Sequence, residues 1–173
     1  MKNILIKFVI NGHFFYPMKF LISEFILIEK NWRVIEMKKD EFIMAVMKHA
    51  GIYDQKVAER GIQIVLSILS HRLTKNEAND VASQLPDDLK KFWNNDVWIT
   101  NLYKISGKRL RYRHKIELMS IVENEIRRSR LDINTEKLCQ AVFHVLKQQV
   151  TDGECKDISG QLPKEIREFF ELA

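Results

Sequence analysis

One stretch of the chain, Thr74 to Trp93, recurs as Thr151 to Phe170, and this repeat limits the possible folds more than any other feature. The match continues upstream into the preceding apolar segments. We therefore expect two similar halves, at about 37–93 and 113–173, that pack together because neither covers its apolar faces alone. The identical pairs are Thr74/Thr151, Glu77/Glu154, Asp80/Asp157, Gln84/Gln161, Leu85/Leu162, Pro86/Pro163 and Phe92/Phe169, with Glu59/Glu136, Val65/Val142 and Leu69/Leu146 upstream.

The first residues of each copy predict the start of a short helix. In a capping box, the threonine oxygen accepts from a free amide at the helix start, and a glutamate bonds back to the threonine's own amide. Thr74 with Glu77, and Thr151 with Glu154, have this spacing. We expect both threonines to be helix caps rather than ligand groups.

The Gln-Leu-Pro sequence inside each copy predicts a joint between two helices. Pro86 and Pro163 donate no backbone hydrogen bond, and they disfavour helical angles at the leucine before them. Proline also suits the first turn of a following helix. Each copy therefore predicts a short helix, a tight joint and a second short helix.

Asp80 and Asp157 are harder to explain, because aspartate is a poor residue for the interior of a helix. Each lies one turn after a glutamate of its own copy, so a cation site is one interpretation. Two carboxylates are too few for a calcium cage. We expect each aspartate instead to pair with a nearby lysine or arginine, and we predict no metal or cofactor.

The remaining segments predict further helices and no sheet, so the expected fold class is an all-α helical bundle. Asp40 and Asp54 suit the caps of the first two helices, and Gly51 suits the end of the first. No segment shows a convincing alternation with a period of two. Further helices are expected near Trp98 to Tyr103, at about 113–130, and from Asn134 or Thr135. The face expected to be buried in the helix at 113–130 contains Ile116, Met119, Val122 and Ile126.

Residues 1–36 do not fit the helical pattern. We predict that they are a mis-annotated upstream extension, loosely packed or disordered, and that translation begins at Met37. They are rich in amino acids with AT-rich codons, and a purine-rich ribosome-binding sequence can be written back from the codons just before Met37. Interspersed charges and Pro17 argue against a membrane anchor or a packed helix. Mass spectrometry of the native N-terminal peptide tests this prediction.

The composition is that of a globular domain, with 46% hydrophobic and 29% charged residues. Cys139 and Cys155 lie in or beside predicted helices and lack the spacing of a metal site, which indicates a reducing compartment and a cytoplasmic protein. No uncharged run approaches the roughly 20 residues of a membrane helix, so no membrane partner is expected. The net charge of +5 is a weak argument for nucleic acid.

Three motifs follow one another along the chain in a set order. They are Asp40-Glu41-Phe42 near a helix start, Glu77-Ala78 to Gln84-Leu85-Pro86, and a degenerate second copy at Gly153-Glu154 to Gln161-Leu162-Pro163. This order resembles a bacterial family known as domain of unknown function 2267, over about Met37 to Ala173. The resemblance implies an all-helical soluble domain, and it supplies no catalytic residues and no established activity.

The basic run from Lys108 to Lys115 is the best candidate for a functional site. Its cations could grip phosphates, and Tyr112 could stack on a base. The alternative is a solvated first helical turn that pairs with acidic neighbours. Cations are mildly unfavourable at a helix N-terminus, which favours a function, whereas the mixed charges further along this helix favour the alternative. The possible nucleic-acid contacts are Lys108, Arg109, Arg111, Arg113 and Lys115.

Catalytic motifs are missing from the sequence. It has no Gly-rich phosphate loop and no HExxH, GxSxG or CxxC motif, so an enzyme is the least favoured class. The leading hypothesis is a non-catalytic module that binds another protein or itself. The alternative is a nucleic-acid-binding helical protein that uses the basic run. A large exposed apolar patch favours the first hypothesis, and a contiguous positive face favours the second.

Overall fold

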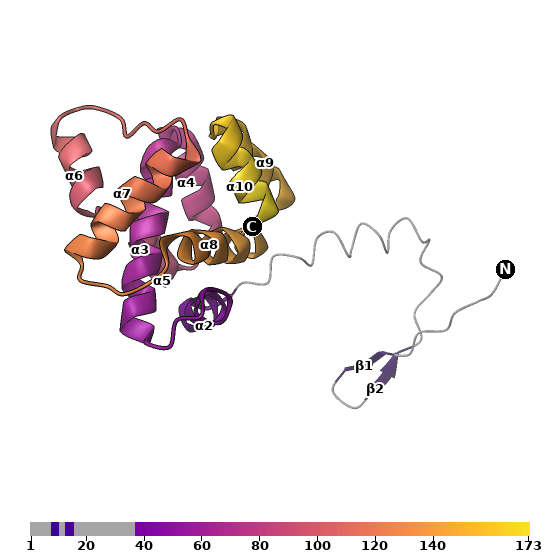
Figure 1. Cartoon of the computed structure of the whole chain (residues 1–173). Coiled ribbons are helices and arrows are strands. Elements are labelled where there is room, and N and C mark those ends of the chain that lie inside the picture. The colour runs from indigo at the N-terminus through magenta and orange to yellow at the C-terminus, as the bar shows by residue number, and fades with distance from the viewer. Residues whose placement is uncertain (1–7, 11–12, 16–36) are drawn as a thin grey trace. The chain divides into compact units, whose positions relative to one another are not determined.

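The computed structural model describes residues 8–10, 13–15 and 37–173. The chain divides into two units, Met1–Arg33 and Val34–Ala173. All described residues of the second unit that have regular structure are helical, which confirms the predicted all-α bundle (Figure 1). The helices are α2 Lys39–Ala50, α3 Gln55–Arg72, α4 Lys75–Gln84, α5 Asp87–Asn94, α6 Trp98–Ile105, α7 Lys115–Arg128, α8 Thr135–Gln149, α9 Asp152–Gln161 and α10 Lys164–Leu172.

The first unit contains two short strands, β1 (Phe8–Ile10) and β2 (His13–Phe15), which pair antiparallel with Phe8 opposite Phe15. The expectation of no sheet does not hold in this unit, because three residues are too few to show an alternation. The Asn-Gly dipeptide between them is the one favoured in two-residue hairpin turns. The expectation that residues 1–36 are a mis-annotated upstream extension, loosely packed or disordered, otherwise lies outside the described residues.

Most of the helix boundaries follow from local capping groups. Oδ1 of Asp54 accepts from the backbone N–H groups of Lys56 and Val57, at 2.8 and 3.1 Å, and α3 begins there as predicted. Gly51 ends α2 with φ of +69°, in the left-handed region that glycine tolerates best. The prediction that Asp40 caps α2 is wrong, because α2 begins at Lys39 and Asp40 lies in its first turn.

The core of the domain lies around α3 and α8, the longest helices of the described chain. They contact each other, and both contact α2 and α7 (Figure 1). α5 covers another side of α3, while α10 covers α8. The largest fully buried side chains include Trp93, Phe42, Phe143 and Phe170, and the Phe143 ring meets the Phe170 ring edge-on at 5.2 Å. None of the described helices is long and apolar enough to cross a membrane.

The buried face of α7 differs in part from the predicted one. Val122 and Ile126 are buried as expected, but the side chain of Ile116 is 74% exposed and Leu118 is buried in its place. Leu118 and Val122 are four residues apart and share one face, whereas Ile116 lies about 200° around the helix from Leu118. The start of α7 at Lys115 places Ile116 on the solvent side of the first turn.

The two Gln-Leu-Pro joints have nearly the same backbone geometry. Leu85 has φ −88° and ψ 144°, and Leu162 has φ −86° and ψ 143°. Pro86 directly precedes α5, and Pro163 directly precedes α10. The prolines therefore stand at equivalent helix starts, as the predicted joint requires.

Candidate functional site

Gln84, the last residue of α4, bonds to the start of α9 in the other copy of the repeat. Its side-chain Oε1 accepts from the backbone N–H of Thr151 at 2.8 Å, and its Nε2 donates to Oε2 of Glu154 at 2.7 Å. The two helices contact each other. One amide side chain therefore serves both a free backbone donor beside the helix start and a buried carboxyl group.

Gln161, at the end of α9, makes the reciprocal bonds to the start of α4. Its Oε1 accepts from the backbone N–H of Thr74 at 2.7 Å, and its Nε2 donates to Oε2 of Glu77 at 3.1 Å. Each copy thus supplies hydrogen bonds to the short helix of the other. We call the six residues involved the glutamine seam: Thr74, Glu77, Gln84, Thr151, Glu154 and Gln161.

The predicted capping boxes form only in part. Oγ1 of Thr74 accepts from the backbone N–H of Glu77 at 3.4 Å, and Thr151 caps α9 in the same way at 3.3 Å. Both threonines are therefore helix caps, as predicted. The predicted return bonds from Glu77 and Glu154 to the threonine amides are wrong, because the glutamine of the other copy occupies each amide.

The displaced glutamates meet inside the seam. Glu154 is only 8% exposed, and its carboxyl lies within hydrogen-bonding reach of the Glu77 carboxyl. Oε1 of each glutamate is buried and has no other partner in the described part of the chain. Burial and the neighbouring Glu77 raise the pKa of Glu154 to about 7. A proton shared between the carboxyls satisfies both oxygens, since one carboxyl then donates to the other.

Asp80 and Asp157 are exposed beside this carboxyl pair. The prediction that each pairs with a lysine or arginine is wrong, because neither forms an ion pair with a described residue. Their charges instead add to the rise in the pKa of Glu154. Across the described ranges, no group of three or more histidine, cysteine, aspartate or glutamate side chains is arranged to hold a metal ion.

Several side chains of the basic run are engaged within the domain. The guanidinium of Arg109 donates to the backbone oxygen of Leu73 at 2.8 Å. Lys115 pairs with Glu136, and its ammonium group also lies 4.4 Å from the centre of the Phe169 ring. These bonds hold the segment before α7 against the bundle, so two of the five proposed phosphate contacts have partners in the fold.

The rest of the run does not form the predicted stacking surface. Tyr112 is buried, with the Arg72 guanidinium 5.7 Å from its ring centre, so it is closed to a base. Lys108, Arg111 and Arg113 are exposed, and their side chains make no ion pair with any described residue. The structure thus leaves three of the five predicted cations available at the surface.

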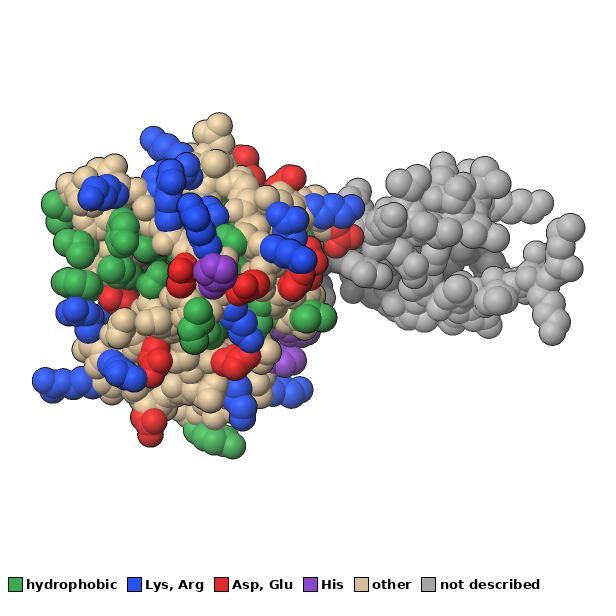
Figure 2. Space-filling view, turned by 45° about the horizontal axis from the view of Figure 1, so that its top comes forward, with side chains coloured by type: hydrophobic (Ala, Val, Ile, Leu, Met, Phe, Trp, Pro, Cys, Tyr) green, Lys and Arg blue, Asp and Glu red, His purple; other side chains and the backbone are tan. Residues whose placement is uncertain are grey.

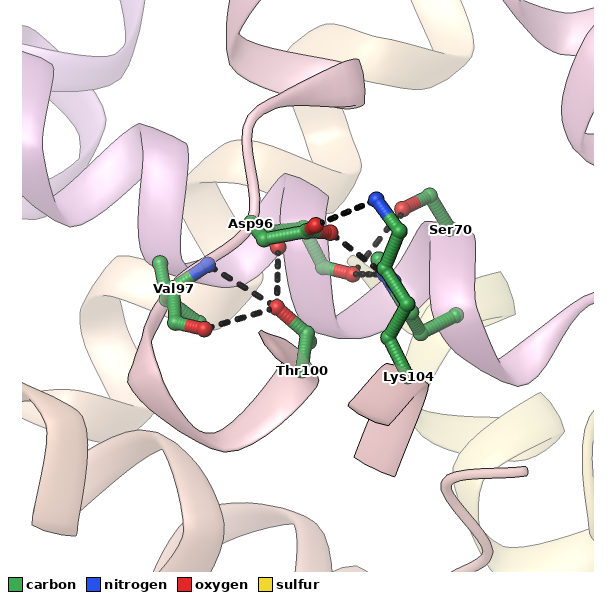
Figure 3. A network of polar contacts seen from close by, with 7 residues as sticks. Ser70, Asp96, Val97, Thr100 and Lys104 are labelled. Carbon is green, nitrogen blue, oxygen red and sulfur yellow. Dashed lines mark hydrogen bonds and ion pairs between the residues drawn. The ribbon is translucent and has the colours of Figure 1, made fainter. Parts of the chain in front are cut away.

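α6 follows the first copy of the repeat along the sequence, and a polar network fixes it to α3 (Figure 3). Oγ1 of Thr100 is buried 3.1 Å from Oγ of Ser67 and accepts from the backbone N–H of Val97 at 2.8 Å. The Asp96 carboxylate pairs with Nε2 of His71 at 3.0 Å and with Nζ of Lys104 at 2.7 Å. These bonds fix both the start of α6 and its orientation on α3.

A second anchor comes from α7. The carboxyl group of Glu125 is buried and hydrogen-bonds to the backbone of Ile99 and Trp98, in the first turn of α6. Burial raises the pKa of Glu125, while these backbone bonds and the Arg128 guanidinium oppose the rise. The Arg128 guanidinium lies over the Trp98 ring, 3.6 Å from its centre. Glu125 thus serves as a helix cap from a distant part of the chain.

The solvent side of α6 carries an apolar stripe, which we define as Trp98, Leu102 and Ile105. Their side chains are 50%, 46% and 77% exposed. The spacing of four and three residues places them on one helix face. Figure 2 shows hydrophobic side chains gathered at the left edge of the domain, the side on which α6 lies in Figure 1. Exposed apolar groups gathered in this way are typical of protein-binding surfaces.

A groove of about 550 Å³ adjoins the stripe. The sequence predicts the short helix but not the groove, because the groove walls come from two segments that only the fold brings together. The apolar spacing at 98, 102 and 105, in a segment absent from the second copy, is the signal that points to this surface. The groove is lined by Trp98, Ile99, Ile121, Asn124, Glu125, Arg127 and Arg128.

These features define a class of protein: an all-α helical bundle in which two copies of a helix-joint-helix motif cap each other. Residues 39–169 match the family described as an uncharacterized conserved protein (DUF2267), and the chain belongs to this family. The resemblance drawn from the helical motifs is thereby confirmed. No curated protein matches the chain.

Proposed function

We propose that this DUF2267 domain is a non-catalytic helical module that binds another protein through α6. The apolar stripe is the observation that carries the proposal. Its three large apolar side chains stay in water although the same helix is fixed by buried polar bonds on its other side. Removing such surface from water is favourable by about 25 cal/mol for each Å². Part of this gain offsets the entropy that the two proteins lose on association. The free thiols of Cys139 and Cys155 support a cytoplasmic setting.

The test compares the full chain with the double variant Leu102→Glu, Ile105→Glu. Tagged protein is used to capture partners from a lysate of the natural host, and captured proteins are quantified by mass spectrometry. Met44→Glu, at another exposed apolar side chain on α2, is the matched control. We expect a partner that the parent and the Met44 variant retain and the α6 variant loses. Equal capture by all three proteins contradicts the proposal.

Nucleic-acid binding is a second candidate, and the exposure of Lys108, Arg111 and Arg113 is the observation in its favour. Electrostatic binding to phosphates is strongest at low salt. If this candidate is correct, changing the three cations to alanine abolishes retention of DNA or RNA at ~50 mM salt and leaves the fold intact. Lys48, Lys56 and Lys75, which are exposed, are changed together to alanine as the charge-matched control. Failure of the parent protein to bind either nucleic acid at this salt concentration eliminates the candidate.

A further inference from the structure

The shape and charge of the α6 surface define the kind of partner that fits it. Resting on the proposed function, we infer that the groove between α6 and α7, together with the apolar stripe, takes an amphipathic helix of another protein that carries acidic side chains beside its apolar face. The occupant is thus a helical segment with carboxylates.

The stripe has the dimensions of a helix-binding surface. From Trp98 to Ile105 it extends for seven residues, or about 10 Å along the helix axis. An amphipathic helix presents its anchoring side chains at the same spacings, i, i+3 or i+4, and i+7. A partner helix of about three turns therefore covers the whole stripe. The adjoining groove gives its apolar side chains space beside Ile99 and Ile121.

The charge on the groove favours a carboxylate. Among the lining residues the charged groups are Arg127, Arg128 and Glu125, and Glu125 is buried against the backbone of α6. Arg127 already has Glu123 as a partner at 2.6 Å. Arg128 lies at the surface, and the carboxylate nearest to it, Glu125, is 3.9 Å away. Its guanidinium can donate to an incoming carboxylate while it stays over the Trp98 ring.

A second copy of this chain fits the surface less well. In a symmetric dimer the same patch meets itself, so each copy brings Arg128, the arginine with the weaker carboxylate contact, towards the Arg128 of the other copy. Like charges that meet across an interface oppose association. An acidic helix brings the opposite charge instead.

The anchored position of α6 favours tight docking. Thr100, Asp96 and Glu125 hold the helix against α3 and α7 before a partner arrives. A surface that is already ordered loses less conformational entropy on binding. The stripe is therefore available as a fixed template.

The experiment uses the full chain as bait for a display library of helical peptides about three turns long. Every peptide carries leucine at i, i+3, i+4 and i+7, and its flanking positions are randomised between glutamate and lysine. We expect about tenfold enrichment of glutamate beside the leucine face, which corresponds to about 1.4 kcal/mol. An Arg128→Glu bait should shift the preference to lysine, and an Arg128→Gln bait, which introduces no new charge beside Glu125, should remove it.

The controls separate this inference from the proposed function. The Leu102→Glu, Ile105→Glu double variant should enrich no peptide, and circular dichroism confirms that each bait is folded. Enrichment that needs the stripe but shows no preference for glutamate, or that prefers lysine, overturns the inference and leaves the proposed function standing. Equal enrichment by the parent and the double variant overturns both. Sedimentation of the parent as a dimer that the double variant abolishes assigns the surface to a second copy and also overturns the inference.

Discussion

Gln84 and Gln161 cap helix starts that are far away in the sequence, whereas an ordinary capping residue bonds within its own helix. Each receives a threonine N–H at the helix boundary and donates to a glutamate three residues further on. Neutral amides suit this place, because they offer an acceptor and a donor at the end of one side chain. The glutamates, released from local capping, lie against each other, with Glu154 buried and Glu77 half-buried.

Replacing Gln84 with alanine should destabilise the domain by about 1–3 kcal/mol, because the buried Glu154 carboxyl loses its donor and the Thr151 amide loses its acceptor. Urea unfolding followed by circular dichroism measures the loss. Gln140→Ala, at an exposed position on α8, is the control and should change the unfolding free energy little. Equal effects of the two substitutions would show that the seam contributes no stability.

Thr74→Ala should cost ~1 kcal/mol, because the amide of Glu77 loses the threonine oxygen. Ser83→Ala provides a comparison within the same helix: its hydroxyl donates back to the Asp80 carbonyl, a bond that does not support the helix ladder. The Ser83 variant should be neutral or slightly more stable in the same unfolding assay. An unchanged free energy for Thr74→Ala would mean that this threonine is not a cap.

At this scale, sequence predicts bonds between near neighbours. Asp54 and Thr74 cap backbone amides that are two or three residues away, so the local sequence is enough to predict both caps. The bond from Gln84 to Thr151 spans 67 positions and depends on how the copies pack. Local rules therefore predict a bond from Glu77 back to the Thr74 amide. In the packed structure Gln161 accepts from that amide instead. The burial of Tyr112 is missed for the same reason, since a distant side chain, Arg72, lies over it.

At the scale of helices, capping residues, glycine and proline explain most helix boundaries. The two glycines Gly51 and Gly160 have different roles. Gly51 has φ of +69° at the end of α2, whereas Gly160 is in the last turn of α9, with open space where a side chain would begin. The first glycine supplies a backbone conformation that other residues resist. The second only weakens its helix.

Opposite responses to alanine are therefore expected at the two glycines. Gly51→Ala should destabilise the domain by about 1 kcal/mol, because alanine is strained in the left-handed region. Gly160→Ala should stabilise it by roughly 0.5–1 kcal/mol, through better helix propensity. Thermal melting of both variants beside the parent checks the pair. Melting temperatures that shift in the same direction would be inconsistent with this account.

Helix position is predicted better than helix face. The sequence predicts a helix near 113–130, and α7 is there, but its apolar residues allow more than one buried face. Leu118, rather than Ile116, turns inward once the helix docks against α3 and α8. The α6 stripe is a second face that the sequence does not predict, because the exposure of its side chains depends on which helices cover α6.

At the scale of the whole domain, the seam makes folding sensitive to pH. The repeat in the sequence predicts that the halves pack together, but it does not predict that the contact brings the carboxyls of Glu77 and Glu154 together. The folded domain holds the proton of Glu154 more tightly than the unfolded chain does, because burial and Glu77 raise the pKa of Glu154 from 4.5 to about 7. Proton uptake is therefore linked to folding.

The contribution of Glu154 to stability should be fully present below about pH 4.5 and should be lost as the pH rises towards 7. Over that range the native state binds more protons than the unfolded state, so the unfolding free energy falls with pH, by roughly 1–3 kcal/mol. Glu154→Gln keeps a donor and an acceptor and should remove this part of the slope. Glu168→Gln, exposed on α10, is the control. Urea titrations across the range measure the slopes, and an unaltered slope in the Glu154 variant would contradict the linkage.

The contacts of the glutamine seam are reciprocal, like those in an interface between identical subunits. In a two-fold dimer, residue i of one chain contacts residue j of the other, and j contacts i in return. Gln84 to Thr151 and Gln161 to Thr74 follow this rule within one chain. A polypeptide with a single copy of the motif would leave its glutamine and its threonine amide unmatched, and a second molecule would satisfy both. Gene duplication and fusion would turn such a dimer into this domain, with α6 and its exposed stripe in the segment that joins the copies.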